Sequence, residues 1–382
     1  MNVLSLFANI GVAEAYLEEI GFNVIVANEF EERRAKLYQE IYPCTNMVCG
    51  DITDNVIFEK VIKLSKNNNV ELIIATPPCQ GMSTAGQQKS DDYRNNLIIH
   101  TISAIKRIKP KYVLIENVPQ FLKTKIYLNN KGITIPELII NELSKIYNLN
   151  FNLVDSKNYS VPQTRERAIV LLSRKDQKKI WEIPLYDNKI VSLKDVIGKL
   201  PSIDPFVKDI SQEEFIKLFP KFEEKRKKAL KISKWNNPPT HVWRQVKSML
   251  YTPTGKSAFT NSKSDHKPKK ENGELVKGFL NTYKRQNWDT PGYTVTMDNV
   301  KISSQNNVHP GRLIGKDSKG NEIYSDPRTL TLYEIMRIMS IPENWPIPEN
   351  ASEAFLRRVI GEGVPPLMVK RFFEQLIVKN EK

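Results

Sequence analysis

The chain has 382 residues, of which 40% are hydrophobic and 26% are charged, proportions that are ordinary for a soluble globular protein. No apolar run approaches the roughly 18 residues of a membrane span, and the first residues resemble a strand without a basic leader, so neither a membrane segment nor a signal peptide is expected. Three cysteines cannot form a disulfide framework, which favours a reducing compartment. The formal net charge of +14 favours a polyanionic partner, most often nucleic acid.

Short β-rich runs alternate with helical patterns over the first part of the chain. Helices are expected over residues 13–20, closed by Gly21, and over residues 96–110 and 135–147. This alternation with nearly continuous apolar strands predicts an α/β fold with a parallel sheet covered on both faces. In such sheets ligands bind at the carboxyl ends of strands, where "FANIG", "NE", "TPPCQ" and "ENV" occur. The expected strands are residues 2–7, 23–29, 70–76, 111–118 and 167–173.

Regularity fades from about Lys178, and residues 200–327 are rich in Pro, Asn, Lys and Ser, which indicates a second, smaller, loop-rich domain. Residues 202–327 contain 23 Lys and Arg against 14 Asp and Glu, so much of the net positive charge lies in this third of the chain. A run such as "KFEEKRKKALKISKW" can also be a solvated helix face, and the charge alone does not separate the two interpretations.

Helical order returns near the carboxyl end of the chain. Thr331 and Glu334 predict a capping box, and Pro342 is expected to end that helix. The last helix is expected to open near Pro366, a residue suited to the first helical turn. Its core-facing residues are predicted to be Leu367, Val369, Phe372, Phe373 and Leu376.

Cys79 follows Pro77 and Pro78 at the end of an apolar run. The two prolines restrict the backbone ahead of the thiol, which suits a nucleophile that is presented from a fixed loop. A cysteine that is buried only for packing does not require such a restricted backbone ahead of it. Cys44 and Cys49 have no nearby cysteine or histidine, so no metal site is predicted.

Nine short motifs occur along the chain in a fixed order: "LFANIG", "ANE", "GDIT", "TPPCQGMS", "RNNL", "ENV", "QTRER", "RTLT" and "IGEGVPP". The ordered set, with a long insert between "QTRER" and "RTLT", resembles the DNA (cytosine-5) methyltransferases of prokaryotic restriction–modification systems. The resemblance implies a Rossmann-like S-adenosyl-L-methionine-dependent methyltransferase sheet. It also implies a catalytic and cofactor-binding domain at residues 1–185, a target-recognition domain at 186–327, and a return segment at 328–382 that completes the catalytic domain.

The resemblance implies a covalent mechanism. Carbon 5 of cytosine is a weak nucleophile, and a thiolate that adds to carbon 6 raises the electron density at carbon 5. Cys79 is the implied thiolate. Glu116 in "ENV" is implied to protonate or hydrogen-bond ring nitrogen N3, although a glutamate there could also serve in an ion pair. The other implied catalytic residues are Arg165 and Arg167, which hold Glu116, the cytosine O2 and the catalytic loop, and the supporting residues Pro78, Asn117 and Gln163.

The implied methyl donor is S-adenosyl-L-methionine, with no metal. Phe7 packs on the adenine in the family, Glu29 suits the ribose hydroxyls, and Asp51 can accept from the adenine amino group. Leu97 and Val364 could equally be core residues. The full implied set is Phe7, Asn9, Ile10, Gly11, Glu29, Phe30, Asp51, Ile52, Pro78, Leu97, Glu362 and Val364.

Three residues depart from the family's usual pattern. Asn9 replaces a glycine, Ser5 stands where an acidic residue is frequent, and Glu362 replaces an asparagine. Asn tolerates a left-handed backbone, so Asn9 is compatible with the turn. Glu362 brings a negative charge to the expected donor site, where it could weaken donor binding or change loop closure.

The predicted activity is methylation of C5 of a cytosine flipped out of duplex DNA, with the basic insert holding the duplex. A cognate restriction endonuclease is a possible second partner, and a cytoplasmic monomer without membrane contact is expected. One alternative is a transfer-RNA cytosine-5 methyltransferase, although the Cys-Phe-Thr tripeptide typical of that family is absent. The other is a catalytically weak DNA-binding member of the fold, but Cys79 and Glu116 are both present.

Overall fold

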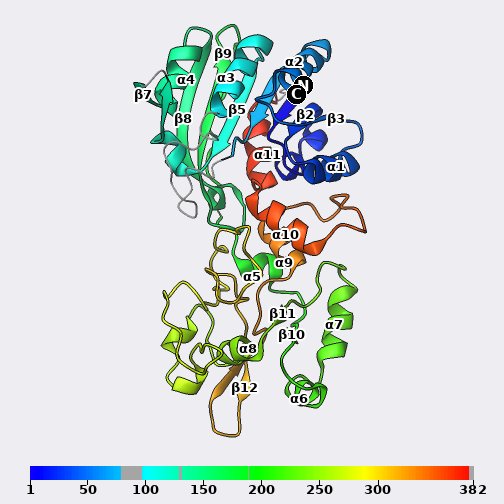
Figure 1. The fold of residues 1–382 in the computed structure, drawn as a ribbon, viewed down its shortest axis with the longest axis vertical. Coiled ribbons are helices and arrows are strands. Elements are labelled where there is room, and N and C mark those ends of the chain that lie inside the picture. The colour runs from blue at the N-terminus through cyan, green and yellow to red at the C-terminus, as the bar shows by residue number, and fades with distance from the viewer. Residues whose placement is uncertain (79–96, 129–130, 188, 378–382) are drawn as a thin grey trace.

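The computed structural model describes residues 1–78, 97–128, 131–187 and 189–377. Figure 1 shows a sheet with flanking helices in the upper part of the molecule and a loop-rich part below it. Helices α9 (Leu332–Ile338) and α10 (Glu353–Glu362) lie between the two parts. None of the described helices is both long enough and apolar enough to cross a membrane.

The upper part is built on a seven-stranded sheet with the strand order β3-β2-β1-β4-β5-β9-β8. Strands β1 to β5 are parallel, which confirms the expected α/β class. The expected strand at residues 167–173 is present as β9, but it runs antiparallel to β5 and to β8, so the sheet is not wholly parallel. The strands are β1 (Asn2–Leu6), β2 (Asn23–Glu29), β3 (Asn46–Cys49), β4 (Leu72–Ala75), β5 (Tyr112–Asn117), β8 (Tyr147–Asp155) and β9 (Glu166–Arg174).

Apolar side chains cover both faces of this sheet, because successive residues of a strand point to opposite faces. Val113 and Ile115 of β5 face the core beneath α2 to α4, whereas Leu114 faces a second core against α11. A Thr134–Glu137 capping box and Pro136 start α4, and Pro366 starts α11 as expected. The helices are α1 (Glu32–Ile41), α2 (Asn55–Asn67), α3 (Leu97–Ile108), α4 (Ile135–Leu143) and α11 (Pro366–Glu374).

The expected helix over residues 13–20 is wrong. Two short 3₁₀ segments, Val12–Glu14 and Glu18–Ile20, occupy this stretch, and Gly21 ends the second one in the left-handed conformation. The first segment is tied to the sheet because Glu14 is buried and accepts hydrogen bonds from Ser5 and Tyr38. The buried hydrogen bonds of Glu14 hold this stretch in short 3₁₀ turns, although its apolar residues have the spacing of an α-helix.

The centre of the molecule is a third apolar core, made by α9, α10, α5 (Leu193–Ile197) and the apolar face of α1. The predicted capping box of Thr331 and Glu334 is present at the start of α9. This helix ends at Ile338, before Pro342, because the chain turns at Ser340, which has a left-handed φ of 59°.

The lower part contains short elements and small apolar clusters. It is also held by fully buried arginines. Arg285 donates to the backbone oxygens of Met249, His309, Ser325 and Asp326. The elements of the lower part are β10 (Phe206–Val207), α6 (Gln212–Leu218), α7 (Phe222–Leu230), β11 (Thr240–His241), α8 (Trp243–Leu250), β12 (Leu313–Lys316) and β13 (Glu322–Tyr324).

A hairpin in the upper part lies at the side of the sheet. It consists of β6 (Lys125–Leu128) and β7 (Lys131–Thr134).

Candidate active site

Most of the predicted site residues lie at the carboxyl edge of the parallel strands. Leu6 at the end of β1 pairs with Asn28 on one side and with Ala75 on the other. Glu29 at the end of β2 pairs with Cys49 of β3. The turn after β1, the end of β2 and the segment after β3 therefore meet at one edge, next to the chain that leaves β4 toward Pro78.

Glu116 lies near the end of β5 and forms an ion pair with Arg167, whose Nε is 2.7 Å from Glu116 Oε1. Both side chains are nearly buried. Burial raises the pKa of the Glu116 carboxyl above its ordinary value, and the positive charges of Arg167 and Arg165 offset only part of that rise. The site therefore holds a carboxyl that retains its proton more readily than one in water.

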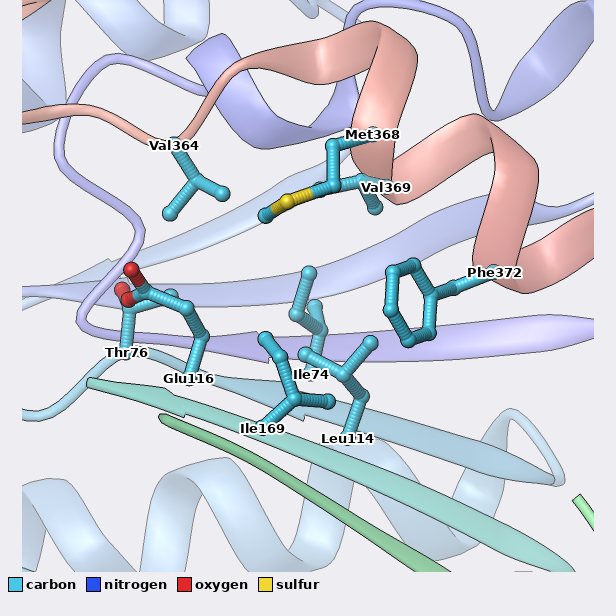
Figure 2. A pocket seen from close by; sticks show the side chains of 9 residues that line it. All are labelled: Ile74, Thr76, Leu114, Glu116, Ile169, Val364, Met368, Val369 and Phe372. Carbon is cyan, nitrogen blue, oxygen red and sulfur yellow. The ribbon is translucent and has the colours of Figure 1, made fainter. Parts of the chain in front are cut away.

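Figure 2 shows the surroundings of Glu116. Its carboxyl group and Thr76 lie at one end of a cluster that is otherwise apolar, beside Val364. These apolar neighbours are the physical source of the raised pKa, because they replace water around the carboxyl group. The remaining members of the cluster are Ile74, Leu114, Ile169, Met368, Val369 and Phe372.

Arg165 and Gln163 connect this corner of the sheet to distant parts of the chain. The guanidinium of Arg165 donates to the backbone oxygens of Val295 at 2.7 Å and Gly363 at 2.9 Å, and also to that of Gly361. Gln163 is fully buried, and its Oε1 accepts from the backbone N–H of Val295 at 2.9 Å. Arg165 therefore links the start of β9 to the segment around Val295 and to the end of α10, and Gln163 links it to the same Val295 segment.

Asn117 lies beside the segment that precedes the predicted nucleophile. Its Nδ2 donates to the backbone oxygen of Pro77 at 3.0 Å, and its Oδ1 accepts from the N–H of Val118. Asn117 therefore braces the strand end next to Pro78. The predicted nucleophile, Cys79, lies outside the described residues.

The turn after β1 has the sharp backbone that the sequence predicts. Phe7 and Asn9 both have left-handed φ values, 60° and 51°, and Gly11 has φ 79°. A Cβ on Gly11 would lie 2.2 Å from the Tyr42 ring, so this position also requires glycine for space. Ile10 is fully buried in the central core and supports the turn from below.

Glu29 is anchored by two backbone donors. Its Oε2 accepts from the N–H of Asn9 at 2.8 Å, and its Oε1 accepts from the N–H of Glu31 at 2.9 Å. Burial raises its pKa, while these two N–H groups and Arg34 act in the opposite direction. Each carboxylate oxygen keeps a second lone pair, so the group can still accept a hydrogen bond from a ligand.

The other predicted donor-site residues differ in exposure. Phe30 is 70% exposed, so its ring is open to solvent beside buried Glu29. The Asp51 Oδ1 accepts from the N–H of Thr53 at 2.9 Å, which fixes the turn after β3. Ile52 and Leu97 are buried in the core beneath the sheet edge, and Val364 is buried in the core on the opposite face.

Two of the three departures from the family pattern have partners that the sequence did not reveal. Ser5 donates to Glu14 Oε1, so a buried acidic group is still present beneath the turn. Glu362 forms an ion pair with Arg34, with Oε2 and Nη1 2.9 Å apart. Glu14 and Arg34 were not predicted, because neither lies in a motif. The only local signal for Glu14 is its position within a mostly apolar stretch.

The third departure, Asn9, also makes a specific contact. Its Nδ2 donates to the backbone oxygen of Val359 in α10 at 2.9 Å. A glycine could adopt the same backbone but could not make this bond. Among the described residues there is no group of three or more His, Cys, Asp or Glu side chains arranged to hold a metal ion.

Comparisons with known proteins agree with this architecture. A family model for the C-5 cytosine-specific DNA methylases matches residues 1–378. The chain is 42% identical over 382 residues to the Type II methyltransferase M1.HgaI of Avibacterium volantium, covering 99% of this chain and 98% of that protein. It is 28% identical over 372 residues to the Type II methyltransferase M.Eco47II of Escherichia coli, covering 95% and 76% of the two chains.

A solved structure shares the fold. A candidate DNA modification methyltransferase encoded within an E. coli prophage aligns with a TM-score of 0.63 at 20% identity, covering 98% of each chain. The whole-length family match and the 42% identical relative establish the family. The chain belongs to the C-5 cytosine-specific DNA methylases.

Proposed function

We propose that this methylase transfers a methyl group from S-adenosyl-L-methionine to C5 of a flipped cytosine in a specific duplex DNA sequence, through a covalent bond between Cys79 and C6. The observation that carries the proposal is the Glu116–Arg167 pair. It combines a buried carboxyl of raised pKa with a cation 2.7 Å away, at the strand end beside the chain that leads to Cys79.

The proposed chemistry begins when the Cys79 thiolate adds to C6 and forms an S–C6 bond. Glu116 hydrogen-bonds or protonates N3, which stabilises the negative charge that moves into the ring. The electron pair at carbon 5 then takes the methyl group, and the donor's sulfur keeps the electrons of the broken S–CH₃ bond and leaves as a neutral thioether. Loss of the C5 proton to a base breaks the S–C6 bond, which restores the ring and the thiolate, and any proton taken up by N3 returns to Glu116. Arg167 holds the Glu116 carboxyl in place, and Arg165 and Gln163 fix the start of β9.

S-adenosyl-L-methionine supplies an electrophilic methyl group on a positively charged sulfur. The residues at the sheet edge fit such a donor: an open aromatic ring at Phe30, an anchored carboxylate at Glu29 and a turn fixed by Asp51. We propose that Phe30 and Phe7 contact the adenine, Glu29 the ribose hydroxyls and Asp51 the adenine amino group. Ile52, Leu97 and Val364 would line the same site.

The proposed division of the chain assigns residues 1–185 and 328–382 to catalysis and residues 186–327 to target recognition. The separate small apolar clusters of the lower part support this division. The insert's basic side chains would contact phosphates, and its loops would read base edges in the major groove. We propose that the protein acts in the cytoplasm as a monomer and protects DNA from a cognate endonuclease, as the Type II names of its relatives suggest.

Incubation with labelled methyl donor and separate DNA and transfer-RNA substrates tests the proposal. Label is expected in DNA, and bisulfite sequencing of DNA from expressing cells would then give the target site. Label only in RNA would favour a transfer-RNA methyltransferase, and none in either would favour a DNA-binding member without activity.

Two variants test the assigned chemistry. Cys79→Ser should abolish transfer while donor binding persists, and Glu116→Gln should lower kcat by about 10²- to 10⁴-fold. Full activity in either variant would remove that residue from the mechanism.

A further inference from the structure

The carboxyl edge of the sheet contains a closed ring of polar contacts that begins and ends on α10. The Asn9 side chain donates to Val359 of α10 at 2.9 Å, and the Asn9 N–H donates to Glu29 Oε2 at 2.8 Å. Glu29 Oε1 accepts from the N–H of Glu31 at 2.9 Å. The ring therefore runs from α10, through the turn after β1, to Glu31 directly before α1.

Arg34 completes this ring on the side of α1. Its Nε lies 2.9 Å from Glu31 Oε2, and its Nη1 lies 2.9 Å from Glu362 Oε2, at the last residue of α10. The Arg34 side chain is only 15% exposed and that of Glu362 21% exposed, so the ion pair between them is only weakly screened by water. Arg358 adds a longer contact, 3.4 Å, to the other oxygen of Glu362.

We propose that Arg34 and Glu362 are positioning residues of the methyl-donor site, because their ion pair closes a ring that holds Asn9 against α10 and holds Glu29 through the N–H groups of Asn9 and Glu31. This inference rests on the proposed function, in which Glu29 binds the donor ribose. Glu362 then does not contact the donor itself. The negative charge that replaces the family's asparagine is neutralised by Arg34.

Arg34 also acts on Glu29 through its charge. Burial raises the pKa of Glu29, and Arg34 is the cation that lowers it. Among the residues that the structure describes, the other ionisable groups that interact electrostatically with Glu29 are Glu31 on the same loop and Cys49 on β3. Since only the carboxylate can accept from both ribose hydroxyls, donor binding weakens as the pH falls through the pKa of Glu29. Without Arg34, that loss occurs at a higher pH.

The ring affects more than the donor site, because α10 contacts both the turn after β1 and Arg165. Gly361 and Gly363 accept from Arg165, whose charge acts on Glu116. A shift of α10 relative to α1 would therefore move the donor-binding turn and the catalytic corner relative to each other. An error of about 1 Å in such a site can cost on the order of 100-fold in rate.

The test is a calorimetric titration of the full-length protein with S-adenosyl-L-methionine at a series of pH values, from neutral pH down to the lowest pH at which the protein stays folded, because the pKa of Glu29 is raised by burial. Arg34→Gln should weaken binding about fivefold to tenfold at neutral pH and move the acidic loss of affinity to higher pH. Glu362→Gln should weaken binding less, about twofold to fivefold, with the pH profile retained, because Arg34 stays beside Glu31.

The double variant and a matched control complete the design. Arg34→Gln with Glu362→Gln should bind about as weakly as Arg34→Gln alone, because both changes break the same ring. Lys36→Gln removes a cation of the same helix, whose ion pair with Glu32 is exposed, and should bind like the unchanged protein. Thermal unfolding of each variant identifies any that has lost its fold.

The outcomes separate this inference from the proposed function. If the unchanged protein does not bind the donor, or if Glu29→Gln leaves the affinity unchanged, the proposed donor site itself is wrong. If Glu29→Gln weakens binding while folded Arg34→Gln and Glu362→Gln bind like Lys36→Gln, the donor site stands and the positioning role is overturned. A weaker Arg34→Gln whose pH profile is unchanged would overturn the electrostatic part of the role.

Discussion

The upper and lower parts of the molecule are stabilised in different ways. In the sheet, strands such as β4 and β5 bury nearly every residue, and their apolar side chains pack against helices on both faces. In the lower part, two fully buried arginines replace much of that apolar packing. Arg285 binds four backbone oxygens, and Arg328 pairs with Asp326 and Glu334 at 3.0 and 2.8 Å.

Buried polar side chains can give a loop-rich region a fixed structure. Irregular backbone leaves carbonyl groups without partners in a sheet or helix, and a buried guanidinium can satisfy several of them at once. Arg328 also joins the lower part to α9, because Glu334 belongs to that helix. The lower part is thus fixed by specific polar interactions. Removing one buried partner there should lower the free energy of unfolding more than breaking an exposed ion pair beside the sheet.

Arg328→Met is expected to destabilise the protein strongly. The change leaves the buried carboxylates of Asp326 and Glu334 without their cation, so the free energy of unfolding should fall by about 3–5 kcal/mol. Urea denaturation measures this loss. Lys106→Gln, which breaks an exposed pair with Glu142 beside the sheet, is the control and should cost less than about 1 kcal/mol. Equal losses in the free energy of unfolding for the two variants would mean that the buried arginine stabilises the protein no more than an exposed ion pair does.

Glu14→Gln tests a buried polar group in the upper part. Burial raises the pKa of Glu14 from 4.5 to about 7, and its hydrogen-bond partners are the hydroxyls of Ser5 and Tyr38. The folded protein therefore keeps a proton that the unfolded chain loses, and stability should fall as the pH rises from about 4.5 to about 7. The fall is on the order of 3 kcal/mol at most.

The glutamine variant removes this titration, so its stability should change less over the same pH range than that of the unchanged protein. Denaturation midpoints measured at several pH values would show it. Parallel pH curves for the two proteins would mean that Glu14 is already ionised at low pH, contrary to its burial.

Phe30→Ala tests the proposed donor site without disturbing the core. The ring is 70% exposed, so its removal should leave stability nearly unchanged, whereas donor affinity should fall about threefold to tenfold because the ring no longer stacks on the donor. Tyr127→Ala, at a 58% exposed aromatic residue on the β6–β7 hairpin, is the matched control and should not change donor affinity. Equal affinities of the two variants would remove Phe30 from the donor site.

The lysines of α7, together with Lys231 directly after it, separate two roles of positive charge. Lys225 pairs with Asp204, which is buried, at 2.8 Å, so it supports the fold. Within the described part of the chain, Lys227 and Lys231 form no ion pair and are exposed. Replacing both with Gln should reduce the salt slope of DNA binding by about 0.9 for each phosphate that is no longer neutralised. An unchanged slope would mean that this face is only solvated.

Much of the sheet could be predicted because apolar runs and strand-end motifs are local signals. Strand β2 has the predicted bounds, and Glu29 and Glu116 lie at the predicted strand ends. Strand β8 was missed because its sequence "NLNFNLVD" alternates Asn with apolar residues, so that it did not form an apolar run. The direction of β9 could not be predicted, because a strand's composition does not encode its pairing partner.

The long-range contacts around the proposed donor site could not be predicted from the sequence. Arg34 and Glu362 are paired across almost the whole chain, and no pattern near either residue indicates the other. The same holds for Asn9 and Val359. Such pairs depend on where α10 packs, which is decided by the central core and not by local sequence.

Covalent trapping of the protein on a duplex substrate shows whether Cys79 bonds to C6 of the target base. A duplex with 5-fluorocytosine at the target position retains fluorine where the C5 proton would leave, so the bond between Cys79 and C6 should persist. With methyl donor present, protein and DNA should remain joined on a denaturing gel, and the joined peptide should contain Cys79. If the two separate although donor and duplex are bound, the covalent mechanism is contradicted.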